Sequence, residues 1–185
     1  MDVIQAINER RAYRSLAAAE VTDDLIRDLA RAAQLAPSCS NNQPEKFVFV
    51  NEADRLKEMQ AALSSGNEWA LAASMIIAVF SRKEDDCIIK EREYHQFDCG
   101  LACAFLILRA TELGLVAHPI AGFSPKKIRA ILGIPEDYQV ITLIIVGRHA
   151  GSLSPNLSEK QIGWEKTRPE RLPLEKIAHR NSFKP

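Results

Sequence analysis

The stretch 93–113 is apolar on nearly every side when it is drawn as a helix, and it limits what this chain can fold into. Phe97, Leu101 and Leu108 lie on one face, while Ala102 and Phe105 cover others. A helix that is hydrophobic all round is either central in its fold or covered by a partner. The sequence therefore predicts a long helix that is central or lies at an oligomer interface.

Hydrophobic periodicity predicts the other elements. A continuous apolar run with β-branched residues indicates a strand buried on both faces at 75–80. Ser124 and Pro125 are typical of a helix start, and that helix should end near Gly133. Further helices are expected at 2–11, 23–35 and 53–63, and further strands at 46–50 and 140–146, with a brief extended segment at 115–118. The order predicts an α+β fold with a small central mixed β-sheet enclosed by helices.

The whole chain, 1–185, is expected to form a single domain. Residues 1–150 would be its body, and 151–185 an extended C-terminal tail. The tail is polar and spotted with proline, so it cannot build a core of its own. We expect it to wrap the body or to reach a partner subunit.

Charge and motifs exclude several classes of function. The chain has 24 Lys+Arg and 24 Asp+Glu, a balance that argues against broad nucleic-acid binding. Its longest apolar run, Leu101–Leu108, is far shorter than the ~20 residues of a membrane span. The N-terminus does not resemble a signal peptide, so a cytoplasmic location is expected. G-x-G-x-x-G, P-loop and H-E-x-x-H motifs are absent.

The expected location bears on the cysteines. Four are present, and in the cytoplasm they should be reduced: Cys39, Cys87, Cys99 and Cys103. Cys99 and Cys103 fall within the apolar helix, where they should pack as small hydrophobic residues.

Three segments are candidates for chemistry. Arg10, Arg11 and Arg14 form a local cation cluster that suits phosphate oxygens, or else a solvated helix end. The loop 36–44 carries short hydrogen-bonding side chains between two prolines and could hold a planar heterocycle, or form a polar turn. The segment 119–123 could support a flat ligand at Gly122, or form a tight turn.

In order and spacing, these segments resemble the flavin-dependent nitroreductase family. The resemblance includes Leu113–Leu115, Leu132–Pro135 and Gly147-Arg148, and it runs from about residue 3 to about 180. It implies a nitroreductase-like fold and a homodimer that binds FMN at the subunit interface and is contacted by the tail. It also implies an NAD(P)H-dependent oxidoreductase. Hydride would pass from NADH or NADPH through flavin N5 to a nitroaromatic, a quinone or a similar small acceptor, by a ping-pong mechanism.

The resemblance also implies which residues bind the cofactor, with no catalytic side chain and no metal. Arg10 and Arg14 would hold the phosphate and ribityl end, and Arg11 would lie beside the pyrimidine edge. Either Arg148 or Arg171 would be the second phosphate cation. The remaining contacts are Ser38, Cys39, Ser40, Asn41 and Gln43 in the loop, some from the partner, Asn67 near the ring, and Pro119, Ile120, Ala121 and Gly122 along one ring face.

The sequence departs from the family pattern at two positions. Ala12 stands where a serine is common, and Glu45 where an aromatic residue is common. A specialised enzyme of the family, dehalogenase-like or flavin-consuming, and a non-catalytic flavin-binding protein remain alternatives.

Overall fold

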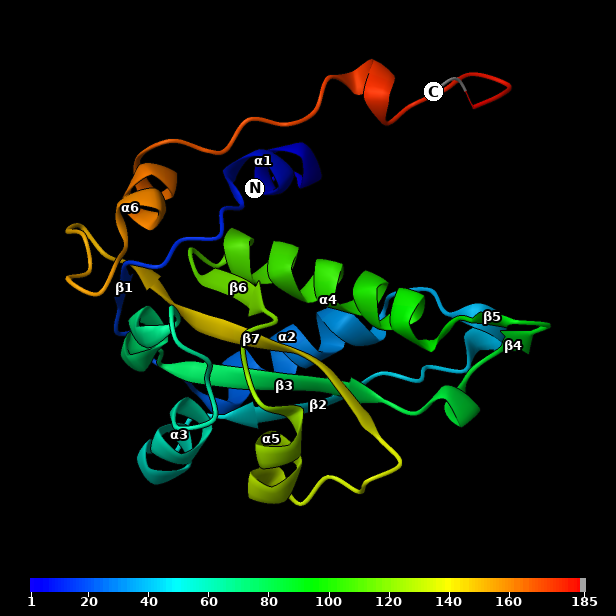
Figure 1. Ribbon diagram of the computed structural model, residues 1–185, viewed down its shortest axis with the longest axis horizontal. Helices are drawn as coiled ribbons and strands as arrows, with labels where there is room; N and C mark the ends of the chain where they lie inside the picture. The colour runs from blue at the N-terminus through cyan, green and yellow to red at the C-terminus, as the bar shows by residue number, and fades with distance from the viewer. Residues whose placement is uncertain (184–185) are drawn as a thin grey trace.

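Two long strands, β3 (Met75–Ser81) and β7 (Gln139–His149), form the centre of the sheet in the computed structural model, which describes residues 1–183 (Figure 1). Successive residues of β3 point to opposite faces. Ile76 packs in one hydrophobic cluster, whereas Met75 and Ile77 pack in the other. The apolar run therefore forms the strand buried on both faces that the sequence predicted.

The sheet has the order β1-β7-β3-β2, and β6 also pairs with β7. The outer strands are β1 (Leu16–Ala17), β2 (Lys46–Val50) and β6 (Val116–Ile120). Within residues 1–183 all the sheet's pairings are antiparallel, so the expected mixed sheet is wrong in this detail. The segment that connects β2 to β3 contains a helix, and β3 begins at the same end of the sheet at which β2 ends, so the two strands run antiparallel. Hydrophobic periodicity does not show at which end of a sheet the next strand begins.

Helices cover both faces of the sheet. Leu29 of one helix and Leu106 of another belong to the cluster on one face, and Met59 and Ile128 belong to the cluster on the other. Thr22 caps one helix. Ser124 caps another at the predicted position, and Gly133, with φ of 67°, ends that helix. The helices are α1 (Val3–Glu9), α2 (Asp23–Gln34), α3 (Ala53–Gln60), α4 (His95–Glu112), α5 (Pro125–Leu132) and α6 (Glu159–Lys166).

The apolar helix α4 has two different faces. Ala102, Leu106 and Ala110 are fully buried against the sheet and α2. Phe97 and Phe105 are 63% and 41% exposed. Of the two positions predicted for this helix, central or at an oligomer interface, its inner face has the first, and the uncovered phenylalanines leave an apolar face on its outer side.

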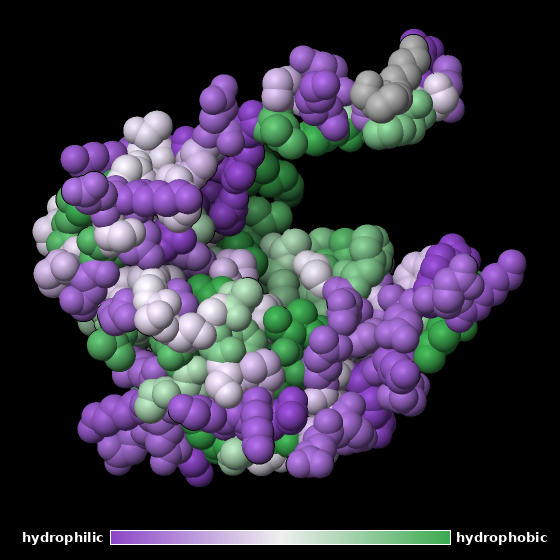
Figure 2. Space-filling model, in the orientation of Figure 1, coloured by the Kyte–Doolittle hydropathy of each residue, from purple (hydrophilic) through white to green (hydrophobic). Residues whose placement is uncertain are grey.

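The described part of the tail, 151–183, consists of two parts. Its first part forms α6, which the sequence did not predict, and Gln161 of this helix donates to the Gly66 carbonyl at 3.0 Å. Beyond Arg168 the chain runs past α1 and away from the body (Figure 1). The space-filling view shows a wide notch between this extension and α4, with apolar surface on both sides (Figure 2).

The cysteines are not all reduced. Cys39 and Cys87 form a disulfide, although reduced thiols were expected. The two residues are 48 positions apart, and the fold brings their loops together near the start of α4. Cys99 and Cys103 are free and buried, and burial raises the pKa of their thiols to about 11 and about 12.

Among the helices of residues 1–183, none is both long enough and hydrophobic enough to cross a bilayer.

Candidate functional site

Five guanidinium groups surround a pocket where the chain leaves α1. The pocket has a volume of about 220 Å³, and no carboxylate belongs to its lining, which consists of Arg10, Arg11, Ala12, Arg14, Trp164, Arg168, Pro169 and Arg171. Arginine forks recognise phosphate oxygens through paired hydrogen bonds. The pocket is therefore suited to a phosphate or a similar anion.

The arginines repel one another. Burial lowers the pKa of Arg10, and the neighbouring charges of Arg168 and Arg171 lower it further. A lowered pKa means that the positive form of Arg10 is less favourable here than in water. A bound anion would remove this penalty, because it would neutralise charges that the protein leaves uncompensated.

The arginine pocket is closed by α6 of the same chain. Arg11 Nη2 donates to the carbonyl oxygens of Trp164 and Glu165, at 2.6 and 3.2 Å. These carbonyls lie at the C-terminal end of α6, where a helix attracts positive charge. Arg168 donates to the carbonyls of Asn8 and Arg10, and these bonds hold the part of the tail that follows α6 beside α1.

A buried carboxylate fastens the same helix. Glu165 is 6% exposed, and it accepts from the backbone N–H groups of Arg14 at 2.6 Å and Ser15 at 3.2 Å. Its Oε2 also lies 3.5 Å from Nε2 of His149. The hydrogen bonds of this side chain thus come from the backbone, and none of them comes from a guanidinium of the pocket.

Aromatic rings connect the pocket to the segment after β6. The guanidinium of Arg14 lies over both Trp164 and Trp69, 5.1 and 5.8 Å from the ring centroids. Trp69 in turn stacks on His118, with centroids 4.7 Å apart. Because His118 precedes Pro119, the arginines and the expected ring-face segment belong to one continuous region.

Asn67 lies beside Gly122, and both are residues for which the resemblance implied a place near the ring. Its Nδ2 donates to the Gly122 carbonyl at 3.0 Å, and Ser64 N donates to the same oxygen at 2.9 Å. A Cβ on Gly122 would lie 2.3 Å from Asn67 Nδ2, so the amide can occupy this place only beside a glycine. Of the neighbouring expected residues, Pro119 and Ala121 are exposed and Ile120 is buried.

The loop with five of the expected site residues lies far from the arginine pocket in the fold; these residues are Ser38, Cys39, Ser40, Asn41 and Gln43. Cys39 N donates to Asp98 near the start of α4, whereas the N-terminal amine of the chain pairs with Glu112 at the other end of that helix. An 18-residue helix is ~27 Å long. The structure therefore separates these five expected site residues from the arginine pocket within one chain (Figure 1).

The two candidates for a second phosphate cation differ in position. Arg171 lines the arginine pocket, and Arg148 is not among the residues that line it. Arg148 instead lies on β7 opposite Ala17, with its Nη1 near Gly114. The geometry favours Arg171 in this role.

His118 has no charge at neutral pH. Burial, with a smaller effect of Arg14 and Arg10, lowers the pKa of its ring to about 4. Its Nδ1 lies 3.0 Å from the Tyr13 carbonyl, an oxygen that can only accept, so Nδ1 carries the proton. The ring is thus a neutral donor that supports the backbone between Arg11 and Arg14.

This pKa predicts a pH dependence of stability. Between pH 6.5 and 4 the unfolded chain binds a proton that native His118 does not, so the stability present above pH 6.5 is lost as the pH falls. We expect the loss from this residue to reach about 3 kcal/mol. Urea unfolding of the wild type and of His118→Gln between pH 7.5 and 4 measures it. Parallel pH profiles for the two proteins would contradict the assignment.

Several residues of this region were missed from the sequence. Trp69 and His118 are single residues outside any motif, and Trp164, Glu165 and Arg168 lie in the tail, for which the sequence predicted only that it builds no core of its own. The resemblance named Arg171, as one of two alternatives, and it did not include the nearby Arg168.

Comparison with known proteins agrees with this fold. The model of the nitroreductase family matches residues 7–148. A relative from Archaeoglobus fulgidus, whose name groups it with NADH dehydrogenases and NAD(P)H nitroreductases, is 29% identical over 153 residues, which cover 79% of this chain and 84% of the relative.

Further similarities extend over nearly the whole chain. An NADH dehydrogenase of Thermus thermophilus is 23% identical over 96% of this chain and 95% of its own. A crystal structure described as an oxidoreductase containing FMN superposes with a TM-score of 0.83 at 28% identity, covering 100% of this chain and 93% of that chain. The family match spans most of the sequence, and the chain therefore belongs to the nitroreductase family.

Proposed function

We propose that this protein is an FMN-dependent oxidoreductase that uses NADH or NADPH to reduce a nitroaromatic, a quinone or a similar small acceptor. The observation that carries the proposal is the pocket of five arginines without a lining carboxylate. The FMN-containing structure that superposes over the whole chain supports the choice of anion. Bound FMN would supply the two-electron chemistry, and the protein would bind, orient and tune it.

The described residues fit this cofactor at both of its ends. Arg10, Arg168 and Arg171 would hold the phosphate, since their charges are otherwise uncompensated. Asn67 and the exposed backbone near Gly122 would face the ring system. Trp69 Nε1 is a buried donor without a hydrogen-bond partner among residues 1–183, which is consistent with a polar ligand group in this region.

We propose that the loop 38–43 completes the site from a second copy of the chain. The loop and the arginine pocket lie at opposite ends of α4, so one chain supplies only part of the expected contacts. Apolar side chains are exposed on α1, on α4 and along the tail, among them Val3, Phe97 and Leu174, at 68%, 63% and 70%. These surfaces border the notch in Figure 2, which a second chain would fill.

The decisive experiment is an anaerobic titration of the purified protein, loaded with FMN, with NADH and then with NADPH. We expect one FMN per chain, bleaching by at least one nicotinamide, and recovery of colour when menadione or nitrofurazone is added. A protein that takes up no FMN from a micromolar solution would contradict the proposal. Light scattering at the same concentration should give a dimer, and a monomer that binds FMN would contradict the shared site.

The same titration separates the alternatives. Bound FMN that neither nicotinamide bleaches would indicate a non-catalytic flavin-binding protein. Bleaching without turnover of quinones or nitroaromatics would favour a specialised enzyme, of the dehalogenase-like or flavin-consuming kind.

A further inference from the structure

The disulfide between Cys39 and Cys87 joins two segments that have few other links. Cys39 begins the loop 39–41, and Cys87 precedes a hairpin of two-residue strands, β4 (Ile88–Ile89) and β5 (Arg92–Glu93). Their other side-chain hydrogen bonds are long: Asn42 Nδ2 donates to Asp86 Oδ1 at 3.3 Å and to Cys87 Sγ at 3.5 Å, and Ser40 Oγ lies 3.6 Å from Cys87 Sγ. Opening the disulfide would therefore leave the two segments weakly attached.

The loop is held in an unfavourable backbone conformation. Ser40, Asn41 and Gln43 have φ values of 52°, 58° and 51°. Residues other than glycine rarely adopt positive φ, and they keep it only where the surroundings enforce it. The disulfide to Cys87 and the bond from Cys39 N to Asp98, at 2.6 Å, are such constraints. Reduction would remove one of them.

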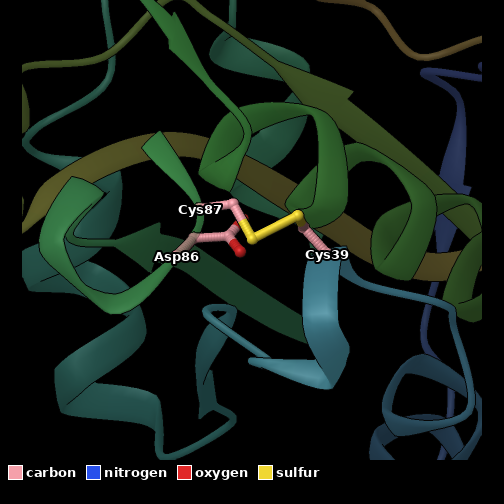
Figure 3. Close-up of side chains that lie close together, drawn as sticks. All are labelled: Cys39, Asp86 and Cys87. Carbon is pink, nitrogen blue, oxygen red and sulfur yellow. A yellow bond between two sulfur atoms is a disulfide. The ribbon is translucent and has the colours of Figure 1, made fainter. Parts of the chain in front are cut away.

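A buried carboxylate beside the sulfur atoms has one oxygen without a hydrogen-bond partner among residues 1–183. Asp86 is 9% exposed, and its Oδ2 accepts no hydrogen bond from residues 1–183. A carboxylate oxygen of Asp86 and the two Sγ atoms all lie within 4.8 Å of one another, and the side chain points toward the disulfide (Figure 3). A disulfide has no hydrogen to donate, so the oxidised pair leaves this oxygen unsatisfied.

Reduction would supply the missing donor. A thiol is a weak hydrogen-bond donor and a disulfide is not one. Asp98 faces Asp86, and burial together with that neighbouring carboxylate raises the pKa of Asp98. The free oxygen of Asp86 can accept a hydrogen bond from a thiol but not from a disulfide, and this favours protonated thiols over the oxidised form.

The core does not require this cross-link. Both hydrophobic clusters are continuous without Cys39 and Cys87, and both cysteines are partly exposed. A chain of this length can bury enough apolar surface to fold without disulfides. A partly exposed disulfide outside the core is of the labile kind that small thiols can reach.

We infer that Cys39 and Cys87 form a reversible thiol–disulfide exchange site that takes small dithiols, with Asp86 as the acceptor for a thiol hydrogen in the reduced state, and that its reduction releases the loop 38–43. A dithiol transfers two electrons and two protons to the disulfide. The S–S bond breaks, two thiols form on the protein, and the small molecule leaves as a cyclic disulfide. This inference does not depend on FMN, and it concerns the chain by itself.

The test is a redox titration of the folded protein in mixtures of reduced and oxidised dithiothreitol at pH 7, trapped with maleimide and read by peptide mass. We expect Cys39 and Cys87 to gain label together under millimolar dithiothreitol, while buried Cys99 and Cys103 stay unlabelled and report that the protein is folded. Asp86→Ala, which removes the acceptor, should lower the ratio of reduced to oxidised protein about tenfold. Glu84→Ala, which removes an exposed carboxylate of the same segment, should leave the ratio within twofold.

Hydrogen exchange measures the release of the loop in a separate experiment. We expect deuterium uptake at 38–43 to rise on reduction to the level of Cys39→Ser/Cys87→Ser, with α4 unchanged. The inference is overturned if the disulfide survives millimolar dithiothreitol in the folded protein, if Asp86→Ala titrates like the wild type, or if deuterium uptake at 38–43 does not change on reduction. Retention of one zinc ion by the reduced protein, with both thiols protected, would overturn it in favour of a metal site.

Discussion

Arg10→Gln is expected to raise the Kd for FMN by about 10- to 100-fold without lowering the stability of the ligand-free protein. A hydrogen bond between a guanidinium and a phosphate contributes ~1.5–3 kcal/mol, which corresponds to this range. In the free protein Arg10 is partly buried and repelled by Arg168 and Arg171, so neutralising it removes a penalty. Fluorescence titration and urea unfolding measure the two effects.

Riboflavin provides the control for this substitution, because it lacks the phosphate. The affinity for riboflavin should be the same in wild type and Arg10→Gln, within twofold. Arg27→Gln, which removes an exposed guanidinium on α2, should change neither affinity. Equal losses for FMN and riboflavin would show that Arg10 acts on the ring or on the fold and not on the phosphate.

Glu165→Ala is expected to lower the free energy of unfolding by about 3–5 kcal/mol. The substitution leaves the backbone N–H groups of Arg14 and Ser15 buried without an acceptor, and breaking a charged pair or network of this kind has a cost of that size. It should also release α6, and with it Arg168 and Arg171 from the pocket. We expect rapid proteolysis near Arg168 and weaker FMN binding in the same variant.

Two further variants test the cause. Glu165→Gln keeps one acceptor oxygen, and we expect it to restore about half of the lost stability. Glu159→Ala removes an exposed carboxylate from the first turn of α6 and should cost less than about 1 kcal/mol. If Glu159→Ala and Glu165→Ala destabilise equally, the helix depends on its own propensity and not on the buried carboxylate.

Elements with a strong local pattern could be predicted from the sequence. The strand at Lys46–Val50 has the predicted bounds, and β3 extends one residue beyond them. α4 begins and ends within two residues of its predicted bounds. Their apolar runs are continuous or periodic, and burial against the sheet is what the pattern encodes.

Elements that depend on a distant partner could not be predicted. β1 is a strand because Leu16 and Ala17 pair with the end of β7. α6 has little hydrophobic periodicity, and polar contacts of Glu165 and Gln161 hold it in place. The disulfide could not be predicted either, because Cys39 and Cys87 are 48 positions apart and no local pattern pairs them.

The candidate site shows the same division. The sequence contains the cluster from Arg10 to Arg14, and its charge pattern left an anion site and a solvated helix end as alternatives. Arg168 joins this cluster through a tertiary contact, because the tail passes alongside α1. The loop 38–43 lies at the other end of α4 from the cluster, and in the proposed function the two would meet only through a second copy of the chain.

The late position of β7 in the sequence determines when the sheet can assemble during synthesis. β1 and β6, taken within residues 1–183, join the sheet through β7 alone. The ribosome must therefore release residue 149 before the N-terminal strand finds its place. Until then β3 has one free edge, a surface on which nascent chains aggregate. A chaperone that shields this edge during synthesis would raise the yield of native protein more than one that acts after release.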